Sequence, residues 1–166
     1  ELGTIELLMT LPIGAANAVL GKFLAAWLFA GIALLLTFPI WMTVAYLGDP
    51  DNGVIVAGYL GSWLMAGCFL AIGSCMSVCS KNQIVAFILT VVVCFFFMVS
   101  GVGMVLDVFT WAPQIMIDFI AGLSLLTRFE AIARGVLDFR DITYFILLII
   151  TWLYLTLVFL QRNKAK

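Results

Sequence analysis

The most constraining feature of this chain is how few charged side chains lie between Lys22 and Asp107. Only Asp49, Asp51 and Lys81 interrupt that stretch. A helix that crosses the hydrocarbon core of a bilayer needs roughly 20 largely apolar residues, and its backbone must be hydrogen-bonded within the segment. We therefore predict an all-α integral membrane protein that forms one domain over residues 1–166. It would have four transmembrane helices, at about residues 22–48, 53–80, 83–106 and 142–161.

The positions of the basic residues predict the orientation of these spans. Lys22 precedes the first span, and Lys81 lies beside Asn82 in a short turn between the second and third spans. Further basic residues follow the fourth span, namely Arg162, Lys164 and Lys166. Four crossings place all of them on one side, and the positive-inside rule makes that side the cytosol. We therefore expect a cytosolic turn at Lys81 and Asn82, with both ends of this chain in the cytosol.

The first two spans have distinct packing signatures. Pro39 removes a backbone hydrogen bond, so the first span should kink toward its outer end. The second span carries small residues four apart, a spacing that lets helix backbones approach closely. We therefore expect the second span to pack against other helices. Its small-residue pairs are Ala57/Gly61, Ser62/Ala66, Gly67/Ala71 and Gly73/Ser77.

The outer segment, residues 107–141, is predicted to be helical in two places. Thr127 to Glu130 matches a capping box, Glu130 and Arg134 can pair at i, i+4, and Gly135 suits a helix C-terminus. A second apolar stretch, 113–121, is interrupted by Gln114 and Asp118. Neither is long enough to cross a bilayer alone. We interpret them as a re-entrant or surface-lying helical pair, and an ordinary outer loop with one amphipathic helix is the alternative.

Residues 1–21 form a cytosolic segment with one short predicted helix. Thr4 is a plausible N-cap, Glu6 lies in the first turn where the helix dipole favours an anion, and Pro12 ends the helix. The body between them is strongly apolar. Such a helix must bury its apolar face, either on the bilayer surface or against a protein partner.

Several kinds of chemistry have no support in the sequence. The chain has no histidine and no basic cluster that would suit a nucleic acid. Cys75 and Cys79 share a helix face, but the four cysteines are better interpreted as small packing residues because no carboxylate lies near them. Gly14 to Phe23 only superficially resembles a phosphate-binding loop, since its glycine spacing is too long and no Ser or Thr follows Lys22.

The N-terminal segment, with several later motifs, resembles a known family. The pattern Glu1-x-Gly3-Thr4-x-Glu6-Leu7-Leu8-x-x-x-Pro12, followed by Val19-Leu20-Gly21-Lys22, is similar to permease subunits of ATP-binding-cassette exporters of the second class. The closest branch is that of the gliding-motility-associated and copper/nitrous-oxide-system permeases. Further similar stretches cover residues 81–87, 123–130, 134–136 and 140–141.

This resemblance implies a function for the chain. The N-terminal helix would be a coupling helix that sits in a groove of a separate ATPase subunit. The residues implied in this contact are Glu1, Gly3, Thr4, Glu6, Leu7, Leu8 and Pro12. The outer pair would be the family's re-entrant helices, which hold Asp118, Arg128, Glu130 and Arg134.

The resemblance also implies which further spans and subunits the complete transporter contains. Six spans are expected per subunit, so two would precede Glu1, and a second permease copy or paralogue would complete the pathway in a bacterial cytoplasmic membrane. ATP and Mg would be bound by the ATPase subunit, and we expect no cofactor, metal or catalytic residue in this chain. The alternatives are an ion-coupled secondary transporter and a non-transporting assembly or scaffold protein. The first alternative is disfavoured because no predicted span carries a clear mid-membrane ionisable residue.

Overall fold

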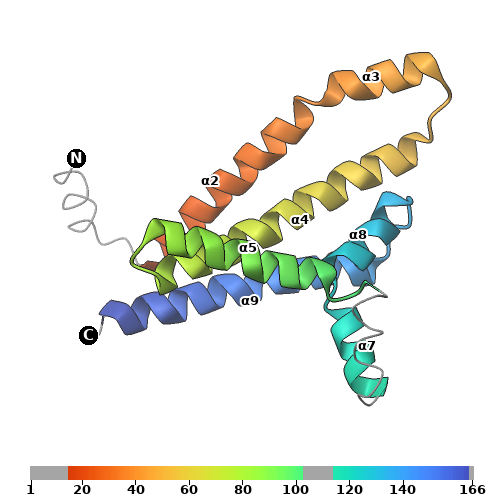
Figure 1. Ribbon diagram of the computed structural model, residues 1–166. Coiled ribbons are helices and arrows are strands. Elements are labelled where there is room, and N and C mark those ends of the chain that lie inside the picture. The colour runs from red at the N-terminus through yellow and green to blue at the C-terminus, as the bar shows by residue number, and fades with distance from the viewer. Residues whose placement is uncertain (1–14, 103–113, 165–166) are drawn as a thin grey trace.

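The computed structural model of the chain describes residues 15–102 and 114–164. Every regular element within these ranges is a helix, which confirms the predicted all-α class. Figure 1 shows their order along the chain. The helices are α2 (Ala15–Leu35), α3 (Phe38–Leu47), α4 (Asn52–Cys79), α5 (Gln83–Val99), α7 (Gln114–Gly122), α8 (Leu125–Ala133) and α9 (Phe139–Lys164).

Among the described residues, three helical stretches are long and apolar enough to cross a membrane, namely Ala16–Leu47, Asn52–Cys79 and Phe139–Arg162. They correspond to the first, second and fourth predicted spans. The third predicted span is not confirmed: its described part, α5, has 17 residues and ends at Val99. At 1.5 Å per residue it is about 26 Å long, which is near the short limit for a crossing. Residues 103–106, the predicted end of this span, lie outside the described ranges.

The helix that contains the first predicted span begins earlier than that span. Residues 15–21, which are predicted as part of the cytosolic segment, belong to α2, and Lys22 lies inside that helix. Three of these seven residues are alanine, the best helix former, so the helix extends beyond the uncharged run. Absence of charge marks where a helix can enter lipid and does not mark where it begins.

The predicted kink at Pro39 is confirmed as a break between α2 and α3. Regular α-helix stops at Leu35 and resumes at Phe38, which places Pro39 in the first turn of α3. Proline is tolerated there because the first N–H groups of a helix have no intrahelical acceptor. The Thr37 hydroxyl donates to the Leu34 carbonyl oxygen at 2.6 Å and so satisfies a carbonyl near the break.

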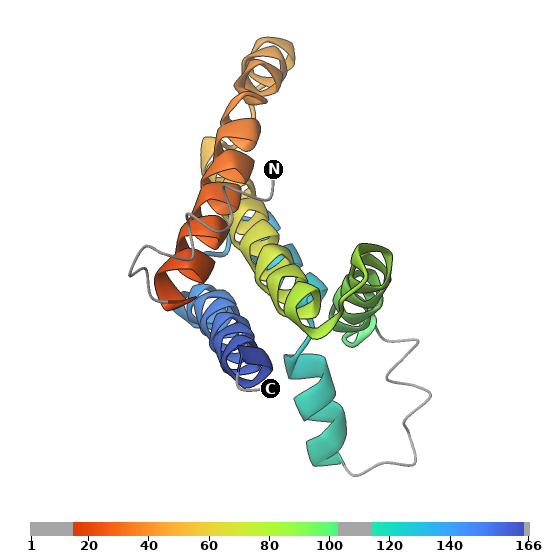
Figure 2. The ribbon, with the colours of Figure 1, turned by 90° about the vertical axis from the view of Figure 1, so that its left-hand side faces the viewer.

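Helix α4 is the centre of the fold, because it contacts α2, α5, α8 and α9. Figure 2 shows α4 beside α2 and α9, with α5 on its other side. Ala57, Gly61, Gly67 and Ala71 are all buried on α4, which confirms close packing for two of the four predicted small-residue pairs. Of the other two pairs, Ser62, Ala66 and Gly73 are only half-buried and Ser77 is exposed.

The two ends of this bundle differ in their charges. The start of α2, the turn between α4 and α5, and the end of α9 lie at one end, and the α3–α4 turn and α8 lie at the other (Figure 1). Lys81 and Arg162 therefore share one end, whereas the opposite end has both signs of charge, with Asp49 and Asp51 in the α3–α4 turn and Arg128 in α8. Large apolar side chains such as Phe29 and Phe96 are exposed between these ends, as expected for surfaces that face lipid or other helices.

Candidate functional site

The structure describes only some of the site residues that the sequence predicts. The predicted coupling-helix residues Glu1 to Pro12 lie outside the described ranges. Asp118 belongs to α7, but its side chain is outside the described part. The predicted turn at Lys81 and Asn82 is confirmed between α4 and α5. There the Asn82 side chain caps α5 by accepting from the Ile84 N–H at 2.9 Å.

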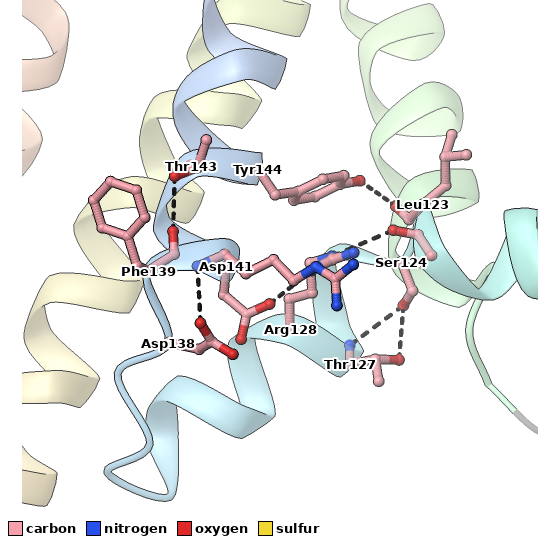
Figure 3. A network of polar contacts seen from close by, with 11 residues as sticks. Leu123, Ser124, Thr127, Arg128, Asp138, Phe139, Asp141, Thr143 and Tyr144 are labelled. Carbon is pink, nitrogen blue, oxygen red and sulfur yellow. Dashed lines mark hydrogen bonds and ion pairs between the residues drawn. The ribbon is translucent and has the colours of Figure 1, made fainter.

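The most connected polar cluster is centred on Arg128 of α8 (Figure 3). Its guanidinium forms an ion pair with Asp141 of α9, with 2.7 Å between Nη1 and Oδ1. The two side chains are only 25% and 14% exposed, so the pair is largely shielded from solvent. The Nε–H of Arg128 also donates to the Gly122 carbonyl oxygen at 3.3 Å. One side chain thus links the end of α7, α8 and the start of α9.

Tyr144 extends this cluster along α9. The Cζ of Arg128 lies 4.3 Å from the centroid of the Tyr144 ring, a cation–π distance. The Tyr144 hydroxyl donates to the Leu123 carbonyl oxygen at 2.6 Å, as Figure 3 shows. Asp141 and Tyr144 are three residues apart and therefore share a face of α9. The cluster holds the α7–α8 connection against that face.

The predicted capping box of α8 is wrong. The helix begins at Leu125, so Thr127 lies inside its first turn, and Ser124 is the N-cap residue. The Ser124 hydroxyl accepts from the Thr127 N–H at 3.3 Å and from the Thr127 hydroxyl at 3.1 Å. Ser124 is fully buried, whereas Thr127 is exposed. Sequence spacing alone could not tell which of two possible caps, three residues apart, starts the helix.

The predicted end of α8 is confirmed at Gly135. This glycine has a φ of 86°, which an L side chain rarely adopts. The N–H of Val136 donates to the Ala131 carbonyl oxygen and that of Gly135 to the Ile132 oxygen, the paired bonds of a Schellman motif. The predicted Glu130–Arg134 pair is present at 3.7 Å, but it is exposed and contributes little.

Gly101 is the close-contact point between the end of α5 and the start of α8. A Cβ at this position would overlap the Ser124 Cβ and lie 2.5 Å from the Thr127 Oγ1. The Ser124 Cβ is fixed to the backbone and cannot rotate away. We expect Gly101→Ala to lower the free energy of unfolding by about 1–3 kcal/mol, measured by thermal unfolding in detergent.

Gly122→Ala is the matched control for this substitution, because a Cβ at Gly122 meets nothing within 4 Å. It should leave the unfolding midpoint close to that of the wild type. Equal midpoints for the Gly101→Ala and Gly122→Ala variants would contradict the close contact between α5 and α8.

A second tertiary feature joins α2 to α4 through two tryptophans. The rings of Trp27 and Trp63 stack with centroids 4.4 Å apart. Each indole N–H donates to the backbone carbonyl of the other tryptophan, at 2.9 and 3.1 Å. Cβ atoms at Gly31 and Gly67 would each lie 2.8 Å from an indole nitrogen, so both glycines make room for a ring. We call these four residues the tryptophan clamp.

In the described residues, no group of three or more His, Cys, Asp or Glu residues could hold a metal ion. Cys68 and Cys75 are buried, and Cys79 is exposed. The Cys68 thiol donates a hydrogen bond to the Phe145 carbonyl oxygen at 3.6 Å inside the core, which joins α4 to α9. The described polar contacts attach α7 and α8 to the start of α9. An apolar cavity lies between α2 and α4.

Asp141, Tyr144 and the tryptophan clamp make contacts between distant helices, and none of them was predicted as a site residue. Asp141 and Tyr144 lie at the start of a long apolar run and look like ordinary interface residues in sequence. The tryptophan clamp had a visible signal, because W-L-F-A-G at residues 27–31 recurs as W-L-M-A-G at residues 63–67. Comparisons of the chain with models of protein families, with curated proteins and with solved structures gave no match.

Proposed function

We propose that this chain is a membrane-spanning subunit of an ATP-binding-cassette exporter, driven by a separate ATPase subunit. The observation that supports this most is the arrangement of the helices. Long apolar helices run between an end where Lys81 and Arg162 lie and an opposite end of mixed charge, where α7 and α8 precede the last span. This is the order that the resemblance in sequence implies. The proposed location is a bacterial cytoplasmic membrane, with both ends of the chain in the cytosol.

The proposal assigns a role to each part of the bundle. Helix α5 would be the third of four crossings, completed by residues beyond Val99, and α7–α8 would be the re-entrant pair at the outer face. The exposed apolar faces of α2, α3 and α5 would contact lipid and a second permease copy or paralogue. Residues 1–12 would dock into the ATPase subunit, which would bind the ATP and Mg.

Substitution in the coupling helix tests the proposal. We expect Leu8→Asp to reduce the ATPase subunit recovered with the purified chain about tenfold or more, because a carboxylate would replace an apolar anchor. Glu6→Gln should weaken ATPase stimulation in the complex by a smaller factor. The measurement is the amount of ATPase subunit that co-purifies with the chain from membranes. Transport and hydrolysis should be uncoupled while membrane insertion is retained.

Asn17→Ala is a suitable control, since Asn17 is an exposed residue of α2 beyond the predicted coupling helix. It should recover the ATPase subunit at the wild-type level. Wild-type recovery by the Leu8→Asp variant, or no ATPase subunit with any variant, would count against the exporter proposal. A scaffold protein would then be the better interpretation.

A further inference from the structure

The space between α2 and α4 contains two adjoining cavities. One has a volume of about 370 Å³ and lies next to the tryptophan clamp. Its walls are almost wholly apolar and include Leu28, Ile32, Leu35, Val56, Leu60 and Trp63. The other, of about 310 Å³, lies toward the α2–α3 break and reaches Phe129 of α8. Leu34 and Tyr59 line both cavities, so the two lie next to each other.

The second cavity differs from the first by its hydroxyl groups. Thr37, Tyr59 and Ser62 all line it. The Thr37 and Tyr59 hydroxyl oxygens are 2.7 Å apart, and the Thr37 hydroxyl donates its proton to the Leu34 carbonyl oxygen. Tyr59 is therefore the donor to Thr37, and the Tyr59 oxygen keeps lone pairs that can accept a hydrogen bond from a ligand. Ser62 supplies a further donor and acceptor.

No residue that lines either cavity carries a charge. A charged ligand group would lose its hydration there without gaining a counter-ion, and that loss is expensive. An uncharged head that bears hydroxyl groups would instead exchange water for the hydroxyls of Tyr59 and Ser62. Each volume lies at the lower end of the range of small-molecule sites, which is about 300–1,000 Å³.

We propose that these cavities bind an uncharged amphiphile with one alkyl chain. The chain would lie in the apolar cavity beside Trp63, and its hydroxyl-bearing head would face Tyr59 and Ser62. As the substrate class of an exporter, this inference rests on the function proposed above. The binding itself is a property of this chain and is measured without an ATPase subunit.

Photolabelling of the full chain in phosphatidylcholine nanodiscs tests this binding. The probe is a 1-monoacylglycerol with a diazirine in its alkyl chain, and the expected adducts map to α2 and α4. Gly58 lines the hydroxyl-bearing cavity, and a Cβ there meets nothing within 4 Å, so Gly58→Leu adds its side chain next to this space from an open position on α4. We expect labelling of that variant to fall about tenfold or more.

Gly21→Leu is the matched control, because Gly21 is also a helical glycine with open space around it and lines neither cavity. It should label as the wild type does. Tyr59→Phe removes only the hydroxyl, and we expect it to weaken monoacylglycerol labelling about 2- to 10-fold. The same variant should leave labelling by a diazirine-bearing alkane unchanged.

Two results would overturn the inference. Equal labelling of the Gly58→Leu and Gly21→Leu variants would show that the probe reports surrounding lipid. Equal competition by a fatty acid carboxylate and by unlabelled monoacylglycerol would exclude a preference for uncharged ligands. Thermal unfolding of each variant verifies that it is folded. Labelling that follows this pattern in a chain that recovers no ATPase subunit would overturn the exporter function and leave the binding site in place.

Discussion

Replacing Gly67 with leucine is expected to lower the free energy of unfolding by about 3 kcal/mol or more, the largest effect expected of any single substitution considered. A Cβ at Gly67 would lie 2.8 Å from the Trp27 Nε1 and 2.9 Å from the Ile149 Cδ1. The Ile149 side chain can rotate, but Trp27 cannot move without leaving its stacking partner. The extra carbons of leucine therefore force α2 and α9 away from α4.

The loss has a polar component as well. If Trp27 shifts, its indole N–H loses the Trp63 carbonyl oxygen, now 2.9 Å away. A half-buried donor without an acceptor adds its own desolvation cost, of about 1–3 kcal/mol. Each tryptophan donates to the backbone of the other, so a shift of Trp27 also weakens the hydrogen bond from the Trp63 indole N–H to the Trp27 carbonyl oxygen.

Thermal unfolding of the purified chain in detergent measures this effect, with Gly58→Leu as control. Both glycines belong to α4, but only Gly67 is buried in a contact with other helices. The Gly58→Leu variant should match or exceed the wild-type midpoint, since glycine is a poor helix former. Equal midpoints for the two variants would mean that the clamp does not limit the approach of α2 and α4.

The second large effect is expected at Arg128. Removing its charge with Arg128→Met should cost about 2 kcal/mol, between the values typical of exposed and of fully buried pairs. The reason is that Asp141, only 14% exposed, would be left without its cation. The same change also removes the bond to the Gly122 carbonyl oxygen and the contact with the Tyr144 ring. Methionine keeps most of the apolar stem.

Arg134→Met is the matched control, because Arg134 pairs with Glu130 at 3.7 Å and the two side chains are 79% and 54% exposed. We expect that change to stay within about 0.5 kcal/mol of the wild type. A double-mutant cycle with Asp141→Asn should recover part of the Arg128→Met loss, since no uncompensated carboxylate then remains. The idea fails if both arginine variants unfold at the same midpoint.

Local sequence patterns predicted much of the fold because their physical causes are local. Pro39 cannot donate a backbone hydrogen bond, so the break between α2 and α3 follows from one residue. The positive φ of Gly135 likewise follows from the needs of a helix end. Small residues on α4 predicted close packing, but not which helices would pack there.

The candidate site was only partly predictable, since its contacts join residues far apart in sequence. Arg128 could pair with several nearby carboxylates in the sequence, and the approach of α8 to α9 selects Asp141. Ser124 is the cap of α8 because the chain turns there against Gly101. The cavities between α2 and α4 exist because the clamp and the break at Thr37 set the spacing of those helices.

The helical class, the strongly apolar character and the charged turns can all be predicted from the order of the residues alone. Hydrogen bonding within a helix and the cost of charge in hydrocarbon depend on neighbouring residues, so composition and spacing are enough to predict them. The central place of α4, the stacking of Trp27 on Trp63 and the ion pair between Arg128 and Asp141 emerge only when the helices pack. These contacts depend on which helix faces fit together, and a local sequence pattern does not predict shape complementarity between distant segments.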